Sequence, residues 1–477
     1  MKQARSPKIG LLLIASPRFR HLGAATERGE YEARKEQEAA RIEKEFAAAG
    51  DIVRAPTVYE REDVKRAICL FSEREVDCAA VMYLSWAEDF AWIRFLRDMP
   101  PLPVMLCSLV HDRLDVGDTE QEDNFVQFLS CGGLVGSLEA SGSIPRLDRK
   151  MLEIALGSGA ELAVRLKAFA VAAMLRSVLR QSTVGLLASY NEVMWSTYVD
   201  PYTVFAQIGP ELRFISVAQL FKTSRDLPDK LVEERVASLK SRFSIKDNVD
   251  GEKLSASVRA SMGLEKLAEA FMLDLLVLND VDATLFEWMG LRPGFVPTSP
   301  DSGLCVVPEG DIGGGLAVYL LTLISGHMAQ FIEPFYIDRE RGLFQGGHAG
   351  PNNYWEHPEN TVIARDERFA KTSYKYAGAP FAWHVFAPGR KTMLHMSQGR
   401  NGRMKMVVTL MDVLSGGHEL VSYSHASFRH PTLSHEKLFE RLLKIGVTQH
   451  YAIAEGEHLS VLKSLADMMD FDFHLID

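Results

Sequence analysis

Short apolar runs alternate with amphipathic stretches along the first part of the chain, and this alternation constrains the fold more than any other feature. The apolar runs are residues 9–15, 79–84 and 104–110, and the charged stretches with helical periodicity are residues 27–49, 63–75 and 88–97. Strands that alternate with helices form crossovers, which make neighbouring strands parallel. The sequence therefore predicts an N-terminal αβ domain over residues 1–180, a doubly wound parallel sheet with helices on both faces.

A second alternation of the same kind follows. A segment rich in Ala, Leu, Met and Arg over residues 148–180 is expected as a long helix that closes the first domain. Beyond it, the pattern predicts a second doubly wound αβ domain over residues 181–328. Its expected strands cover residues 184–188, 213–217, 275–278 and 305–311, and its expected helices cover residues 230–243, 251–271 and 316–325.

After about residue 328 the pattern becomes rich in strands. Apolar runs over residues 392–398 and 404–411 flank an Asn-Gly pair within residues 399–402, which is a strong hairpin signal. Helices are expected over residues 436–444 and 459–469, and a last strand over residues 472–476. The sequence thus predicts a β-rich, barrel-like third domain over residues 329–477 in an α/β protein.

Composition excludes several classes of partner. The formal net charge of −10 over 477 residues argues against nucleic acid, because phosphate binding needs a basic surface. The longest apolar stretch, residues 316–325, is shorter than the roughly 20 residues that span a bilayer, so no membrane segment is expected. Five scattered cysteines without a C-x-x-C pair suggest neither a disulfide framework nor a structural zinc site. A cytoplasmic location is expected.

Histidine is concentrated in the C-terminal part of the chain. Twelve of the 14 histidines lie from His327 onward, which directs the search for chemistry to that part. Most of them are expected to be surface or structural residues. Spacing does not select among them, because no H-x-H occurs and His418-Glu419 has Ser422 where an H-E-x-x-H helix needs its second histidine.

Two positions have a local context that suits a ligand site. Glu309 follows a predicted strand and precedes a glycine-rich turn into a helix, which is where open αβ sheets bind ligands. The turn lacks the Gly-Lys-Ser/Thr ending of a phosphate-binding loop, and its ordinary interpretation is a flexible connection. His348 is flanked by glycines that let the backbone approach a ligand closely, although a loop between strands has the same composition.

Four short motifs carry acidic or histidine side chains in this part of the chain. They are Glu-Gly-Asp at residues 309–311, Phe-Ile-Glu-Pro-Phe at 331–335, Gly-Gly-His at 346–348 and Gly-Val-Thr-Gln-His at 446–450. Together they resemble the motifs of the L-arabinose isomerase family, within the wider L-fucose/L-arabinose isomerase-like fold. The resemblance extends over nearly the whole chain and is weakest in the first domain.

The resemblance implies that Glu309, Glu333, His348 and His450 bind one divalent metal ion. Mn²⁺ is the expected ion, with Co²⁺, Fe²⁺ or Mg²⁺ as substitutes, because the ligand shell mixes nitrogen and oxygen and leaves positions open. Moving a carbonyl from C1 to C2 of a sugar needs a base, an acid and a cation that stabilises an ene-diolate. Glu309 and Glu333 would be both ligands and the acid/base pair.

The first domain departs from the family where family members contact sugar hydroxyls. Phe128 and Cys131 replace a Gln and a His, and residues 16–23, which include Arg18, Arg20 and His21, replace the family's Ser-Gln-x-Leu-Tyr-Gly. Arg18, His21 and Cys131 are therefore candidate substrate-binding residues for a different polyol, sugar acid or phosphorylated sugar. The alternative for the basic segment is a solvated loop.

The expected function is metal-dependent aldose–ketose isomerisation of a small-molecule sugar other than L-arabinose. An epimerase or a lyase on the same scaffold is the alternative, since an ene-diolate can be reprotonated elsewhere or lose a group. A non-catalytic sugar-binding protein is less favoured, because sensing does not explain paired carboxylates. The resemblance also implies a homo-oligomer, a trimer or hexamer, in which one subunit's first domain completes its neighbour's site.

Overall fold

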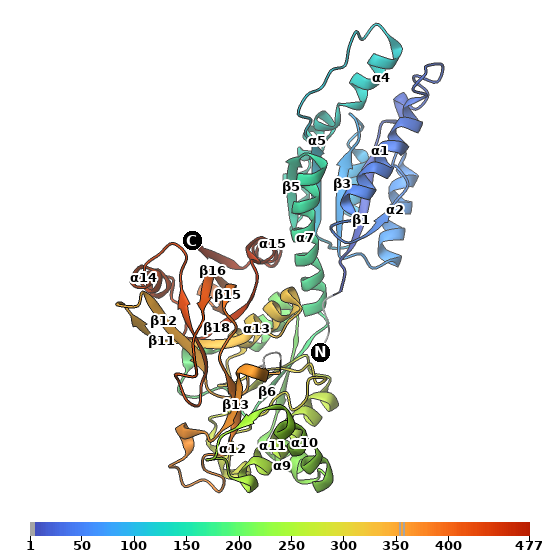
Figure 1. The fold of residues 1–477 in the computed structure, drawn as a ribbon. Coiled ribbons are helices and arrows are strands. Elements are labelled where there is room, and N and C mark those ends of the chain that lie inside the picture. Colours follow the sequence, from blue (N-terminus) through green and yellow to red (C-terminus); the bar gives the residue numbers. More distant parts are fainter. Residues whose placement is uncertain (1–4, 353, 356–357) are drawn as a thin grey trace. The chain divides into compact units, whose positions relative to one another are not determined.

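A computed structural model describes residues 5–352, 354–355 and 358–477 (Figure 1). The chain divides into two compact units. The N-terminal unit consists of residues 5–177 and 460–469, and the C-terminal unit contains residues 178–459 and 470–477. The domains predicted for residues 181–328 and 329–477 lie almost wholly in this second unit, so the boundary at residue 328 stays a prediction.

The N-terminal unit is built on a five-stranded parallel sheet. Its strands are β1 (Lys8–Ile14), β2 (Asp51–Arg54), β3 (Cys78–Tyr83), β4 (Val104–Leu109) and β5 (Leu152–Gly157). Its helices are α1 (Tyr31–Phe46), α2 (Arg61–Glu73), α3 (Phe90–Asp98), α4 (Glu122–Ser130), α5 (Gly133–Ser141), α6 (Ile144–Leu147), α7 (Gly159–Leu179) and, from the end of the chain, α15 (Leu459–Met469). The strand order β2-β1-β3-β4-β5 is that of a doubly wound sheet, which confirms the predicted fold class.

Apolar packing explains this arrangement. Every residue of β1 after Lys8 is buried, as expected for a strand covered on both faces. On one face, Leu12 of β1 shares a core cluster with Phe71 of α2 and Trp92 of α3.

The single helix predicted over residues 148–180 is wrong in its first part, where β5 precedes α7. Strand β5 lies at the edge of the sheet and leaves Ile154 and Leu156 about half exposed. Its Leu, Glu and Ala residues favour a helix locally, and pairing with β4 overrides this preference.

The first half of the C-terminal unit contains a second parallel sheet. Its strands are β6 (Thr183–Leu187), β7 (Glu211–Ile215), β9 (Leu275–Leu278) and β10 (Cys305–Val307), in the order β10-β9-β6-β7. Its helices are α8 (Pro201–Thr203), α9 (Val217–Arg225), α10 (Asp229–Arg242), α11 (Gly251–Phe271), α12 (Ala283–Met289) and α13 (Ile312–Ser325). Because β6, β9 and β10 are adjacent and parallel, the loops that follow them meet at one edge of the sheet.

Helix α13 begins at Ile312 and includes the glycine triplet at residues 313–315, which the sequence suggested to be part of a flexible connection. These glycines form the first helical turn, and close packing requires them. A Cβ on Gly313 would lie 2.4 Å from the Met396 carbonyl oxygen, and a Cβ on Gly315 would lie 3.0 Å from Val277 and Val307. The triplet therefore brings α13 against the parallel sheet on one side and β15 on the other.

The strand-rich region of the C-terminal unit forms a closed ring of strands. Its seven-stranded sheet contains β11 (Gln330–Asp338), β12 (Leu343–His348), β15 (Gly389–Gln398), β16 (Met404–Leu414), β17 (Ser424–Arg429), β18 (Tyr451–Glu455) and β19 (Asp472–Ile476). The order is β15-β18-β11-β12-β17-β16-β19, and an additional β15–β16 pairing closes a ring of six strands, with β19 paired to β16. This closure agrees with the barrel-like region expected from the sequence, and the predicted β15–β16 hairpin is present, with Asn401 in its turn at a φ of 57°.

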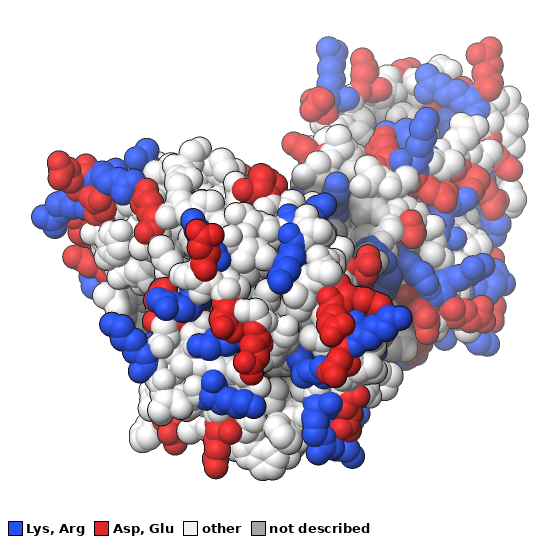
Figure 2. All heavy atoms as spheres, turned by 60° about the horizontal axis from the view of Figure 1, so that its bottom comes forward, with Lys and Arg blue, Asp and Glu red and all other residues white. Residues whose placement is uncertain are grey.

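Smaller elements complete this unit. A three-stranded sheet joins β8 (Ser244–Ile245), β13 (Thr361–Ala364) and β14 (Phe381–His384), and α14 (His435–Ile445) packs on the barrel through Leu438 and Leu442. Among the described residues, no helix is both long enough and apolar enough to pass through a bilayer. On the face shown in Figure 2, basic and acidic side chains are interspersed rather than gathered by sign.

Candidate metal centre

Glu309 lies in a strained turn just after β10. Its φ of 64° is in the left-handed region, which costs a non-glycine residue roughly 1–2 kcal/mol. The end of the neighbouring strand β9 holds the turn in place. The Glu309 amide donates to Asp280 Oδ1 at 2.8 Å, and the Gly310 amide donates to the Leu278 carbonyl at 3.2 Å. Backbone strain that the surroundings hold in place is common at functional sites.

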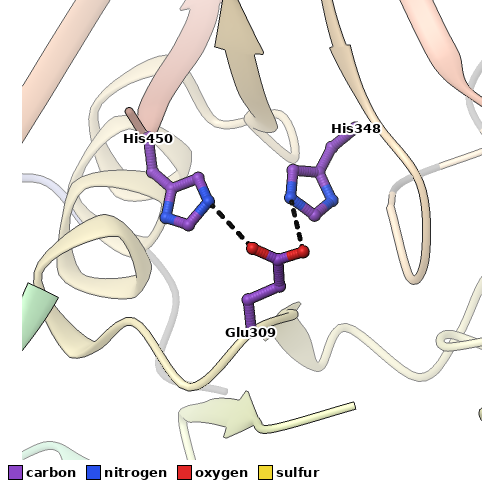
Figure 3. Close-up of side chains that lie close together, drawn as sticks. All are labelled: Glu309, His348 and His450. Atoms are coloured by element: carbon purple, nitrogen blue, oxygen red, sulfur yellow. Dashed lines mark ion pairs between the residues drawn. The ribbon is translucent and has the colours of Figure 1, made fainter. Parts of the chain in front are cut away.

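Two histidines from the barrel face this turn. His348 is the last residue of β12, and His450 immediately precedes β18 (Figure 3). His348 Nδ1 donates to the Ala349 carbonyl at 2.7 Å, and His450 Nδ1 donates to Asp311 Oδ2 at 2.8 Å. In each ring the second nitrogen, Nε2, is therefore the one directed at Glu309, which is how metal-binding histidines are oriented.

The three side chains converge in a buried space. One potential ligand atom from each of Glu309, His348 and His450 lies within 4.8 Å of the others. His450 Nε2 is 3.3 Å from Glu309 Oε2 and His348 Nε2 is 3.8 Å from Glu309 Oε1, and the side chains are at most 3% exposed (Figure 3).

Within the described part of the chain, Glu309 Oε2 and both Nε2 atoms are buried without a hydrogen bond of good geometry. Buried polar atoms without partners are costly, and a cation among them would satisfy all three. Two imidazoles and one carboxylate also form a common ligand set for divalent transition metals. The group could therefore hold a metal ion.

The charges of the centre are strongly coupled. Burial acts to raise the pKa of Glu309, but the two imidazoles hold it well below its usual range. Burial acts to lower the pKa of His450, but its interactions with Asp311 and Glu309 raise it to about 9. Without a metal, a proton on His450 balances these carboxylates at neutral pH, and a metal ion would have to displace that proton.

Asp311 has two roles that sequence reasoning missed. Its Oδ1 accepts the Gly314 amide at 2.9 Å and caps α13, while its Oδ2 orients His450. Aspartate before a helical segment is an ordinary N-cap signal, so the first role could have been found. The second role could not, because His450 is distant in sequence. Phe331 forms a wall of the centre, with its ring 4.9 Å from His348 and 4.6 Å from His450.

A buried network of ionic groups lies next to the centre. Arg292 donates to Asp280 Oδ2 at 3.1 Å, to Asp366 Oδ2 at 2.7 Å and to the Ala349 carbonyl at 3.3 Å. These three charged side chains are at most 4% exposed. Burial raises the pKa of Asp280, whereas Arg292 keeps a raised pKa because the two carboxylates outweigh its own burial. Asp280 accepts the Glu309 amide, and Ala349 directly follows His348. The network therefore joins the turn that contains Glu309 to the end of β12.

Glu333, the fourth predicted ligand, is not a member of the group of three. It lies on β11, partly exposed, and pairs with Gly347, the residue before His348. The register shifts between Pro334 and Tyr336, and such irregularities redirect nearby side chains. The structure thus places Glu333 on the strand beside His348, and its assignment as a ligand and as a catalytic residue stays a prediction.

The predicted substrate-binding residues belong to the N-terminal unit. Arg18 Nε pairs with Glu88 Oε1 at 2.9 Å, and its guanidinium lies 5.0 Å from the centre of the Trp86 ring. His21 is 85% exposed and faces Glu30 at 3.4 Å. Cys131 directly follows α4 and its thiol donates to the Gln127 carbonyl at 3.1 Å, and burial raises the pKa of that thiol. Their role in substrate binding stays a prediction.

No protein-family model matches the chain, and no curated protein matches it either. The resemblance to L-arabinose isomerases therefore rests on the four motifs.

Proposed function

We propose that this protein is a metal-dependent aldose–ketose isomerase, similar to L-arabinose isomerases but acting on a different sugar. One observation carries the proposal: Glu309, His348 and His450, three residues of the motifs that suggested the family, come together in space with buried ligand atoms that face one another and have no hydrogen bond of good geometry. They come from three separate places in the sequence, the turn after β10, the end of β12 and the residue before β18, so chance proximity of three such atoms is a poor explanation.

One divalent ion, with Mn²⁺ the first candidate, would be held by these residues, and Glu333 is the proposed fourth ligand. When bound, such an ion polarises a substrate carbonyl and stabilises negative charge on adjacent oxygens. His348 and His450 would keep their Nε2 lone pairs directed at the site through the hydrogen bonds of Nδ1 to Ala349 and Asp311. The ring of Phe331 would exclude water beside them.

Proton transfer is assigned to the two glutamates. In an ene-diol route, one carboxylate removes the proton from C2 of the aldose and returns it to C1, while the other serves the oxygens. Glu309 has the stronger surroundings for a lasting negative charge, because two imidazoles face it. Glu333, which is partly exposed on the neighbouring strand, is the candidate for the carboxylate that moves the proton between C2 and C1.

Metal content and ketose formation test the proposal together. Purified protein loaded with Mn²⁺ should hold one ion per chain and convert at least one member of a panel of aldoses, sugar acids and sugar phosphates to a ketose. His348→Ala combined with His450→Ala should abolish both, whereas His458→Ala, which lies outside the group, should change neither. Full activity after chelation would refute the proposal.

Isotope exchange tests the route. In D₂O the ene-diol route should place deuterium at C1 of the ketose. Glu309→Gln and Glu333→Gln should each lower kcat by about 10²-fold to 10⁴-fold, the usual loss when a general acid or base is removed. If a variant keeps its metal and a near-normal kcat, that glutamate is not the acid or base. Label at another carbon would favour the epimerase alternative.

A further inference from the structure

Arg368 reaches the candidate metal centre from the protein surface. Its Nη2 lies 3.5 Å from Glu309 Oε1. The Arg368 side chain is 35% exposed, whereas the Glu309 side chain is 3% exposed. A single side chain thus connects the buried carboxylate with solvent, and it carries a permanent positive charge.

The backbone that carries Arg368 is held firmly. Its amide donates to Asp366 Oδ1 at 3.1 Å, and the other oxygen of Asp366 is bound by the buried Arg292. Ser422 Oγ accepts the Glu367 amide at 3.1 Å and donates to the Arg365 carbonyl at 3.0 Å. These contacts fix the backbone from which the guanidinium reaches the site, as recognition residues require.

The charge of Arg368 has little local compensation. Among the residues that the structure describes, Glu309 is the one acidic partner of its guanidinium, and their 3.5 Å contact is long for a charge-assisted hydrogen bond. A guanidinium offers five N–H donors. A divalent ion held by Glu309 would also take up the charge of that carboxylate, leaving Arg368 as a cation beside the site.

We infer that Arg368 binds an anionic group of the substrate, so that the sugar is a carboxylate or a phosphate ester rather than a neutral aldose. This inference rests on the proposed function, since it assigns a substrate class to the same site. A planar guanidinium matches both anions through paired hydrogen bonds, which explains an arginine at this position better than a lysine. Arg368 is then a specificity-determining residue.

Equilibrium binding tests the inference without depending on turnover. Each sugar in the arabino, gluco and galacto configurations is supplied as the aldose, as its uronate, which keeps the C1 aldehyde, and as its terminal phosphate, and is titrated by calorimetry into the Mn²⁺-loaded protein. The uronate and phosphate arms separate the two sources of negative charge. We expect one anionic member to bind about 10-fold to 100-fold more tightly than its neutral counterpart, the range of one or two charge-assisted contacts.

Substitutions of Arg368 test whether this residue causes the preference for anionic sugars. Arg368→Met should bring the ratio of anionic to neutral affinity close to one with metal content unchanged, and Arg368→Lys should keep part of it. Arg365→Met is the matched control, because Arg365 lies in the same segment and pairs with Glu367 at 2.8 Å. Melting curves verify that all variants fold.

The results distinguish the inference from the proposed function. Equal affinities across the panel, including no binding by any member, or an anionic preference that survives in Arg368→Met, would overturn the inference. Ketose formation from a neutral sugar without an anionic preference would keep the function and reject the inference. An Arg368-dependent preference for anions without any ketose formation would keep the inference about anion binding and reject the proposed function.

Discussion

Replacing Asp280 by Asn should damage the metal centre without touching a ligand. The two side chains have the same shape, and the amide oxygen can still accept the Glu309 amide that Asp280 Oδ1 binds at 2.8 Å. The new NH₂ group would then face Arg292 Nη1, which donates to Asp280 Oδ2 at 3.1 Å. The change thus sets two donors against each other in a fully buried place.

The contacts that Arg292 keeps in the Asp280→Asn variant set the size of the stability loss. Breaking a buried ion pair usually costs about 3–5 kcal/mol, but Arg292 keeps two contacts with Asp366, so we expect a loss of about 2–3 kcal/mol in the free energy of unfolding. The strained turn at Glu309 would also lose a charged acceptor. Removing a group that orients a metal ligand typically lowers metal affinity by about 10-fold to 100-fold, and we expect Asp280→Asn to fall in that range.

Urea unfolding and calorimetric titration with Mn²⁺ at fixed pH measure the two effects. Asp366→Asn is the matched control, because it removes the other carboxylate of Arg292 but no contact to Glu309. Asp366→Asn should lower the free energy of unfolding by a similar amount, and it should lower Mn²⁺ affinity less than Asp280→Asn does. The reasoning fails if Asp280→Asn binds Mn²⁺ as the natural chain does, or if both variants lose metal affinity equally.

Three further results are expected. Mn²⁺ at about 100 times its dissociation constant should stabilise the fold by about 2.7 kcal/mol in thermal melts, and this gain should vanish in the chain with both His348→Ala and His450→Ala. The pKa of His450, raised to about 9, means that its proton stabilises the metal-free fold fully below about pH 6.5 and progressively less as pH rises through 9. Mn²⁺ affinity should therefore rise about tenfold per unit between about pH 7 and 8.5, and a flat titration would contradict this assignment. Cys131→His should change the relative kcat/KM among sugars but not metal affinity, and unchanged ratios over a broad panel would remove Cys131 from the substrate site.

Elements with strong local signals could be predicted from the sequence. The helix over residues 251–271 and the last strand over residues 472–476 have the expected bounds, because periodicity and flanking residues mark both ends. Pairing with distant segments cannot be recognised in this way. The strand β5 at the sheet edge was hidden by helix-favouring residues, and β8 has only two residues that become a strand by pairing with β13.

The candidate site shows the same division. The position of Glu309 after a strand pointed to a ligand group, and the motifs suggested both histidines. The network around Asp280 could not be predicted, because Arg292 and Asp366 are 74 residues apart and are joined only in the folded chain. Glu333 illustrates the opposite limit: a motif marks the residue, but the direction of its side chain depends on strand register and an adjacent irregularity.

The three side chains of the centre lie at strand ends of two different sheets, so an ion bound to them would link the two sheets. Glu309 follows the parallel sheet, whereas His348 and His450 come from the barrel. Apolar packing of α13 holds these layers together but tolerates small sliding movements, because hydrophobic contact is not directional. Coordination bonds are short and directional, so an ion at this position would cross-link the barrel to the parallel sheet. Loss of the ion should then loosen both layers at once, and hydrogen exchange should quicken together at β10, β12 and β18.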